Sequence, residues 1–138
     1  MKRLLSGITI LFVFTASLDI SAQCSDKGFI DGCKAALDKF IFIKAFDIND
    51  TNAEYSYVFS KGTTYVITTC EKNTNEQLIV ELYDRTRKKV ASNFDKKSKK
   101  YNSKIGYQCQ ATGVYYMKYY FADGSKDCGM SMIGFVKK

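Results

Sequence analysis

The chain has 138 residues, of which 46% are hydrophobic and 25% are charged, and its formal net charge is +7. This length suits one domain with a modest core. The sequence contains no histidine, which excludes Ser-His-Asp and Cys-His catalysis and histidine-ligated zinc, and we expect no cofactor.

Residues 1–22 have the layout of a secretory signal peptide. Met1–Arg3 is a short cationic start, and Leu4–Leu18 is mostly apolar. Ser21 and Ala22 are small residues that suit cleavage of the peptide. We therefore expect a protein that is secreted, or that is periplasmic and belongs to the cell envelope.

Two alternatives would keep the N-terminus attached to a membrane. The apolar run is shorter than the roughly 20 residues that a spanning helix needs, which argues against a retained anchor. Cys24 could carry a lipid, although Gln23 before it is larger than the residue that lipid attachment prefers. Cleavage leaves residues 23–138 as a single domain with no further transmembrane segment.

The start of that domain, residues 23–39, is its least β-like part. Cys24 and Cys33 enclose a small polar loop, and exported proteins with several cysteines are expected to form disulfides. We therefore predict a Cys24–Cys33 disulfide. Apolar residues at helical spacing predict a short helix near Cys33–Lys39.

Residues 40–138 alternate strand-like segments with turn residues. Eight candidate strands are present: 40–46, 54–60, 63–71, 77–84, 89–93, 104–110, 114–121 and 128–136. Their close spacing, with almost no helix, predicts an all-β fold: an antiparallel β-sandwich or jelly roll of about eight strands. The first strand is apolar nearly throughout, which predicts that it is covered on both faces or lies at a sheet centre. The last two strands are expected to pair as a closing hairpin.

Four motifs after Glu54 follow one another in a recognisable order. They are YVFSKGTTYVI (57–67), LYD (82–84), VASN (90–93) and TGVYYMKYYF (112–121). Together they resemble the bacterial pre-peptidase C-terminal domains, which are secreted jelly-roll modules appended to proteases and other exported proteins. The segment before residue 47 and the cysteines depart from that module. The resemblance implies a non-catalytic accessory or binding role and supplies no catalytic residues.

A basic stretch in the second half of the chain is the strongest charge feature. Its candidate ligand-binding residues are Arg85, Arg87, Lys88, Lys89, Lys96, Lys97, Lys99, Lys100 and Tyr101, and Lys104 follows. Only Asp84 and Asp95 oppose these charges. The stretch predicts a surface for an anionic glycan, an envelope component or a protein partner. The alternative is a solvated loop whose lysines discourage edge-to-edge strand pairing. No recognition motif for nucleic acid is present, so nucleic acid is not an expected partner.

A weak candidate calcium site lies between the first two predicted strands. Asp47, Asn49, Asp50 and Asn52 supply oxygen atoms of the kind that calcium prefers. The segment lacks the glycine and the terminal glutamate spacing of an EF-hand, and the same residue types are favoured in turns. The sequence therefore assigns no metal.

The other three cysteines, Cys70, Cys109 and Cys128, come from three predicted strands. Five cysteines are an odd number, so at least one is left over or pairs between chains. We favour a Cys109–Cys128 disulfide, which would leave Cys70 free and buried as a small apolar side chain. A Cys70–Cys109 disulfide is the alternative.

Tyr115, Tyr116, Tyr119 and Tyr120 alternate in pairs, so each face of their strand receives two tyrosines. One pair should belong to the core. The other pair could form an aromatic platform for sugar rings or a peptide, or could simply pack across neighbouring strands.

The leading functional prediction is a non-catalytic binding module that acts outside the cytoplasm. One alternative is a structural or assembly component that pairs through a strand edge. A small enzyme would have to rely on Asp, Glu, Lys, Tyr or Cys, and no pair of glutamates has a spacing that marks a glycosidase site.

Overall fold

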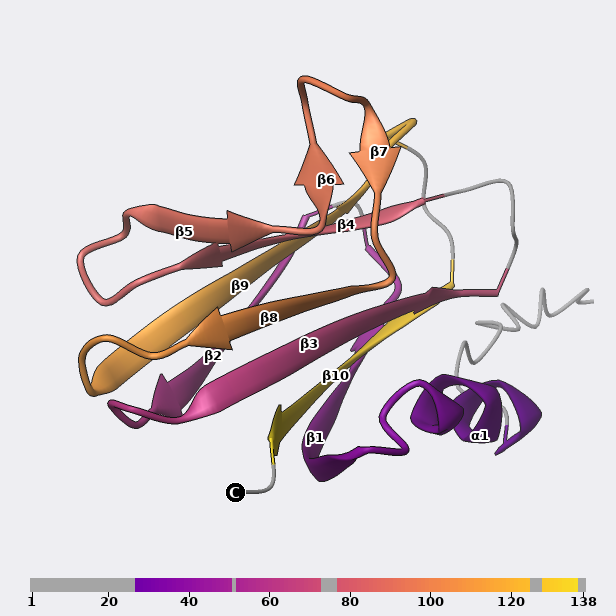
Figure 1. The fold of residues 1–138 in the computed structure, drawn as a ribbon. Coiled ribbons are helices and arrows are strands. Elements are labelled where there is room, and N and C mark those ends of the chain that lie inside the picture. The colour runs from indigo at the N-terminus through magenta and orange to yellow at the C-terminus, as the bar shows by residue number, and fades with distance from the viewer. Residues whose placement is uncertain (1–26, 51, 73–76, 125–127, 137–138) are drawn as a thin grey trace, which may run out of the picture.

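A computed structural model of the protein describes residues 27–50, 52–72, 77–124 and 128–136 (Figure 1). Within these ranges the chain is mostly antiparallel β-sheet with one short helix, which confirms the predicted all-β class. The predicted signal peptide and Cys24 lie outside the described residues. Across the described ranges, no helix has the length and apolar character needed to cross a membrane.

Eight strands form two four-stranded sheets, and all eight strands predicted from the sequence are confirmed. The first sheet has the order β1 (Phe40–Ile48), β10 (Gly129–Val136), β3 (Thr64–Glu71) and β8 (Lys104–Gln108). The second has the order β2 (Ala53–Phe59), β9 (Gly113–Phe121), β4 (Leu78–Tyr83) and β5 (Lys89–Ser92). A separate hairpin of β6 (Phe94–Asp95) and β7 (Lys100–Tyr101) lies in the basic stretch, between two of the predicted strands.

The main core lies between the two sheets. Strand β9 shows why: its buried residues alternate with more exposed ones, so Tyr115 and Tyr119 point inward while Tyr116 and Tyr120 point outward. The predicted division of the four tyrosines between the two faces is thus confirmed. Phe59 from β2 stacks on Tyr115 with ring centroids 4.8 Å apart, and burial of such large aromatic side chains stabilises the sandwich.

The predicted closing hairpin is wrong, although both of its strands exist. β9 pairs with β2 and β4, whereas β10 pairs with β1 and β3, so the two strands lie in different sheets. The turn residues 122–124 correctly end one strand. They do not determine its partner, because strand pairing depends on contacts with residues far away in the sequence.

β1 is an edge strand and does not lie at a sheet centre, so the other predicted alternative, cover on both faces, is the one that part of the strand fits. Phe46 faces the main core, whereas Phe40 and Ala45 pack on the other side of the sheet with the helix. Ile41 and Phe42 remain 39% and 47% exposed. The strand is apolar on both faces because each face meets a different partner, not because it is central.

The helix α1 (Lys27–Ala35) begins six residues before the predicted start at Cys33. The described part of the predicted Cys24–Cys33 loop is therefore helical. Phe29, Ile30 and Cys33 lie on one face of the helix and pack, with Leu37 after it, on the outer side of the first sheet. Gly28 and Gly32 obscure this pattern, because glycine is a poor helix former.

Candidate functional site

The predicted basic stretch is divided by the fold into two separate groups. Arg85, Arg87, Lys88 and Lys89 lie in the β4–β5 turn and at the start of β5. Residues 96–100 form the tip of the β6–β7 hairpin, which projects beyond the two sheets at the top of Figure 1.

The β4–β5 group is largely occupied by contacts within the protein. The guanidinium of Arg87 pairs with the Glu54 carboxylate at 2.9 Å and stacks 3.5 Å from the ring centroid of Tyr116. The side chain of Arg85 lies against Gly113. Lys88 is exposed, and its backbone N–H donates to the Asp84 carboxylate at 3.0 Å. A ligand at this turn would have to displace Arg87 from two favourable contacts.

Glu81 lies at the centre of the outer face of the second sheet. Its carboxylate accepts hydrogen bonds from the Tyr83 hydroxyl at 2.6 Å, the Lys89 ammonium at 3.2 Å and the Tyr120 hydroxyl at 3.4 Å. Burial alone would raise the pKa of Glu81, but the hydrogen bonds and the charge of Lys89 hold the pKa below its usual value. The hydrogen bond between Tyr83 and Glu81 also raises the pKa of the Tyr83 hydroxyl to about 12.

These contacts weaken the case for an aromatic binding platform on this face. Arg87 covers the ring of Tyr116, and the hydroxyls of Tyr83 and Tyr120 are both committed to Glu81. A sugar ring that stacked on Tyr116 would first have to remove the guanidinium. The outward tyrosines are thus engaged in packing across neighbouring strands.

The β6–β7 hairpin has a stiff base and a tightly held turn. Phe94 and Tyr101 face each other across it, with ring centroids 4.4 Å apart. The Asp95 carboxylate accepts hydrogen bonds from the Lys97 backbone N–H at 2.9 Å and the Ser98 hydroxyl at 2.8 Å. These hydrogen bonds lower the pKa of Asp95, the Ser98 hydroxyl contributing most. The turn is thus held in one shape by its own side chains.

Lys99 occupies a backbone position in that turn that favours glycine or asparagine. Its φ angle is 52°, in the left-handed region that side chains with a Cβ rarely adopt. A hairpin selected only for its turn would gain from glycine here. The turn instead carries a fourth lysine at a small conformational cost.

Asn93 fixes the hairpin to the sandwich at the point where β5 ends. Its side-chain oxygen accepts the Val80 backbone N–H at 2.9 Å, and its amide donates to the Leu78 carbonyl at 2.9 Å. The amide also reaches the Thr69 hydroxyl of the other sheet at 3.3 Å. The side chain therefore satisfies backbone groups of β4 beyond the end of β5, and it links the two sheets through Thr69.

The tip of the hairpin carries four lysines of the basic stretch. Lys96, Lys97, Lys99 and Lys100 are all exposed, and no carboxylate in the described part of the chain forms an ion pair with any of them. Tyr101 is half-buried at the base of the hairpin. The structure thus brings together five of the nine predicted residues and separates them from the other four.

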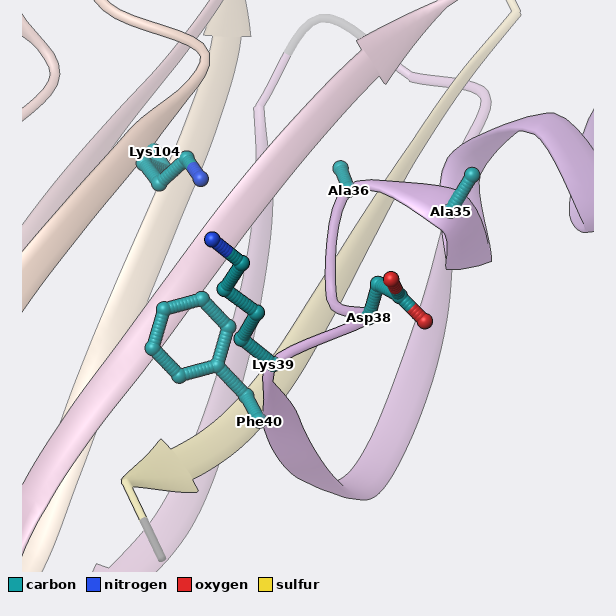
Figure 2. Close-up of a pocket in the computed structure, with 6 residues that line it drawn as sticks. All are labelled: Ala35, Ala36, Asp38, Lys39, Phe40 and Lys104. Atoms are coloured by element: carbon teal, nitrogen blue, oxygen red, sulfur yellow. The ribbon is translucent and has the colours of Figure 1, made fainter.

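Lys104 belongs to neither group. It lies beside the turn between α1 and β1, with its Nζ atom 5.6 Å from the ring centroid of Phe40. Figure 2 shows Lys104 and Lys39 directing their amino groups towards the same space, while the Asp38 carboxylate points away. This open cavity has a volume of about 320 Å³, and two ammonium groups face it. Its lining residues are Ala35, Ala36, Asp38, Lys39, Phe40 and Lys104.

The predicted calcium residues extend from the end of β1 into the loop before β2. Asp47 lies in β1 and uses its backbone carbonyl to accept the Tyr55 hydroxyl at 2.8 Å. Asn49, Asp50 and Asn52 are exposed in the loop. Within the described ranges, no three acidic or cysteine side chains come together as metal ligands.

Cys33, Cys70 and Cys109 are free thiols in the structure, which supports none of the three predicted disulfides, although Cys24 itself lies outside the described residues. β3 and β8 are neighbours, but Cys109 follows the end of β8 that pairs with Thr64, whereas Cys70 is at the opposite end of β3. Six residues of strand span about 20 Å, far beyond the reach of a disulfide. Cys128 lies at the Cys70 end as well, so Cys109–Cys128 fails for the same reason. Cys128 is disulfide-bonded.

Neither a family model nor a curated protein matches this chain. The assignment of a function therefore depends on the geometry of the chain itself.

Glu81 and Asn93 are the organising residues that the sequence analysis missed. Glu81 is the one charged residue of the otherwise apolar segment LIVELY, and this pattern could have indicated it. Asn93 looked like an ordinary residue at a strand end. Its role depends on the neighbouring strand, which the local sequence does not reveal.

Proposed function

We propose that the protein is a non-catalytic binding module that acts outside the cytoplasm and contacts an anionic partner through the tip of the β6–β7 hairpin. The partner is an anionic glycan or another acidic component of the envelope. The observation that carries this proposal is the group of four exposed lysines on a rigid hairpin, without ion pairs in the described part of the chain.

The fold supports a module of this kind. Consecutive strands such as β1 and β2, or β9 and β10, alternate between the sheets, as they do in jelly rolls. We assign the eight main strands to that class, with the β6–β7 hairpin inserted between β5 and β8. A jelly roll is also the fold that the resemblance to pre-peptidase C-terminal modules implies, and such modules are accessory domains rather than enzymes.

Electrostatics favour the hairpin over the β4–β5 turn as the contact surface. The hairpin lysines attract an anion without first breaking an internal ion pair, whereas Arg87 and Lys89 are already paired with Glu54 and Glu81. Side-chain ordering is the main cost at the hairpin, because its backbone is held by Asp95 and by the ring stack at its base.

A charge-removal experiment tests the proposal. A variant with Lys96, Lys97, Lys99 and Lys100 changed to Gln is compared with the unmodified protein for binding to immobilised heparin as a model polyanion. Each lysine near an anionic surface contributes about 1 kcal/mol, so the variant should bind at least about 100-fold more weakly at low salt. Binding by the unmodified protein should weaken as salt is raised.

The matched control removes the same charge elsewhere. Lys27, Lys34, Lys61 and Lys118 are also exposed, and changing these four to Gln lowers the net charge equally. If the control loses as much affinity as the hairpin variant, binding reflects net charge and the hairpin is not the site. Vesicles with and without anionic phospholipid then distinguish a membrane from a glycan as the anionic component.

A second candidate function is assembly through the exposed edge of β1. Ile41 and Phe42 are exposed there, which favours a partner strand. The edge also carries a register shift between Phe42 and Lys44 and an exposed lysine, two features that discourage strand addition. We therefore rank this function second. A Phe42→Lys variant that no longer forms a complex or oligomer seen with the unmodified protein would support it.

A further inference from the structure

The helix α1 is held to the first sheet by a small second core that contains two cysteines. Cys33 from the helix is only 2% exposed and packs with Met130 and Met132 of β10. Cys70 is half-buried near the end of β3, directly opposite Met130 in the strand ladder. The two cysteines, 37 residues apart in sequence, pack in this one cluster, and each thiol perturbs the pKa of the other.

We propose that Cys33 and Cys70 form a disulfide that joins α1 to β3 when the protein meets an oxidising environment. The proposal follows from the contact between the two thiols and does not depend on the identity of the anionic partner. It differs from the predicted Cys109–Cys128 and Cys70–Cys109 disulfides, which would join cysteines that the fold keeps at opposite ends of the first sheet.

The third free thiol, Cys109, has a different environment from Cys33 and Cys70. It is 1% exposed, and its thiol lies 3.2 Å from the Ala111 carbonyl and 3.5 Å from the Tyr115 hydroxyl, at the other end of the sandwich. No second cysteine of the described part of the chain is near it. Cys109 is thus a satisfied core residue, whereas Cys33 and Cys70 are each other's partners.

The environment of the pair gives the two thiols different roles. The hydrogen bond from Cys33 lowers the pKa of Cys70, against the opposing effects of burial and of the nearby Glu71 carboxylate. The same hydrogen bond, together with burial, raises the pKa of Cys33. Because Cys70 is also the more exposed of the two, it is the thiol that an oxidant reaches first.

The oxidant is a disulfide-bonded thiol compound, for example oxidised glutathione. The Cys70 thiolate attacks one of its sulfur atoms, forms a mixed disulfide and displaces one glutathione thiolate, which takes up a proton. Cys33 then loses its proton and attacks the Cys70 sulfur, displacing the second glutathione as a thiol. Two protein thiols are oxidised to one disulfide, and one glutathione disulfide is reduced to two thiols.

Peptide mapping under non-reducing conditions tests the proposal directly. The full chain is incubated with a glutathione redox buffer, its remaining thiols are alkylated in denaturant, and it is digested with trypsin. The expected product is peptide 28–34 linked to peptide 62–72, with the loss of two hydrogen atoms. The number of titratable thiols should fall from the three present in the structure to one.

Recovery of peptides 28–34 and 62–72 as separate alkylated species would overturn the proposal, as would a link from either peptide to one containing another cysteine. A Cys109→Ser variant should give the same linked peptide, because Cys109 takes no part in it. Cys70→Ser, compared with oxidised unmodified protein, should lower the melting temperature by roughly 10 °C. An equal loss when both proteins are kept reduced would show that the contribution is packing and not a disulfide.

Discussion

Replacement of Asn93 by alanine should destabilise the protein more than its position at the end of a short strand suggests. The side chain is 2% exposed and bonds to the backbone N–H of Val80 and the carbonyl of Leu78, both in the buried strand β4. Alanine leaves both groups without these hydrogen bonds. An unsatisfied buried group costs about 1–3 kcal/mol, so the two together should cost about 2–6 kcal/mol.

The lower part of this range is the better expectation. A cavity of about 240 Å³, lined in part by Leu78, Thr69 and Asn93, lies beside the freed groups. Water that enters it can replace some of the lost hydrogen bonds. We therefore expect Asn93→Ala to lower the free energy of unfolding by about 2–3 kcal/mol, equivalent to roughly 10 °C in melting temperature for a domain of this size.

Urea denaturation followed by circular dichroism measures this change. Asn102→Ala is the matched control, because Asn102 is exposed and connects to Asn93 only through its backbone N–H. Exposed substitutions of this kind usually change stability by less than about 0.5 kcal/mol. If Asn93→Ala unfolds within that margin of the unmodified protein, the bridging role of the Asn93 side chain is refuted.

Two further predictions concern buried polar groups. The Glu81→Gln variant should be about 1–2 kcal/mol less stable at neutral pH, because it loses charge-assisted hydrogen bonds from Tyr83 and Lys89. The pKa of Glu81 is lower in the folded protein than in the unfolded chain. The stability difference between the two proteins should therefore be complete above about pH 4.5 and disappear as the pH falls through the folded pKa. Urea titrations at several pH values measure this difference. A Tyr119→Phe variant should lose about 1 kcal/mol of unfolding free energy, because it removes the 2.8 Å hydrogen bond to the buried Ser131 hydroxyl. An unchanged melting temperature in thermal unfolding would contradict this prediction.

Local patterns were enough to locate the strands but not to pair them. Alternation along Thr112–Phe121 correctly divided the tyrosines between two faces, because side-chain direction in a strand depends only on its local geometry. The partner of that strand is set by burial against β2 and β4, which lie about 40 to 60 residues away in sequence. For the same reason the sequence identified a hairpin where the chain crosses from one sheet to the other.

The sequence predicted which residues make up the candidate site, but not that the fold divides them into two groups. Nine basic and aromatic residues formed one stretch in the sequence, and the fold separates them because β5 lies between the two groups. Charge alone could not show that Arg87 and Lys89 are paired, since Glu54 and Glu81 come from other strands. The cysteine predictions failed similarly, because proximity along the chain or between strands does not fix which ends of the strands meet.

The lysines of the hairpin tip are separate from the residues that stabilise the fold. Its four lysines make no contribution to the core, which is formed by the two main sheets, and its base is fixed by Asn93 and by the stack of Phe94 on Tyr101. Removal of charge at the tip should therefore leave the free energy of unfolding within about 0.5 kcal/mol of its original value. A substitution at Asn93 should do the opposite, lowering stability while every lysine is retained. Heparin binding is then measured for both variants. Weaker binding by the lysine variant alone would show that the tip binds through its charge. Unchanged binding would indicate a loop whose lysines only discourage pairing of the sheet edge.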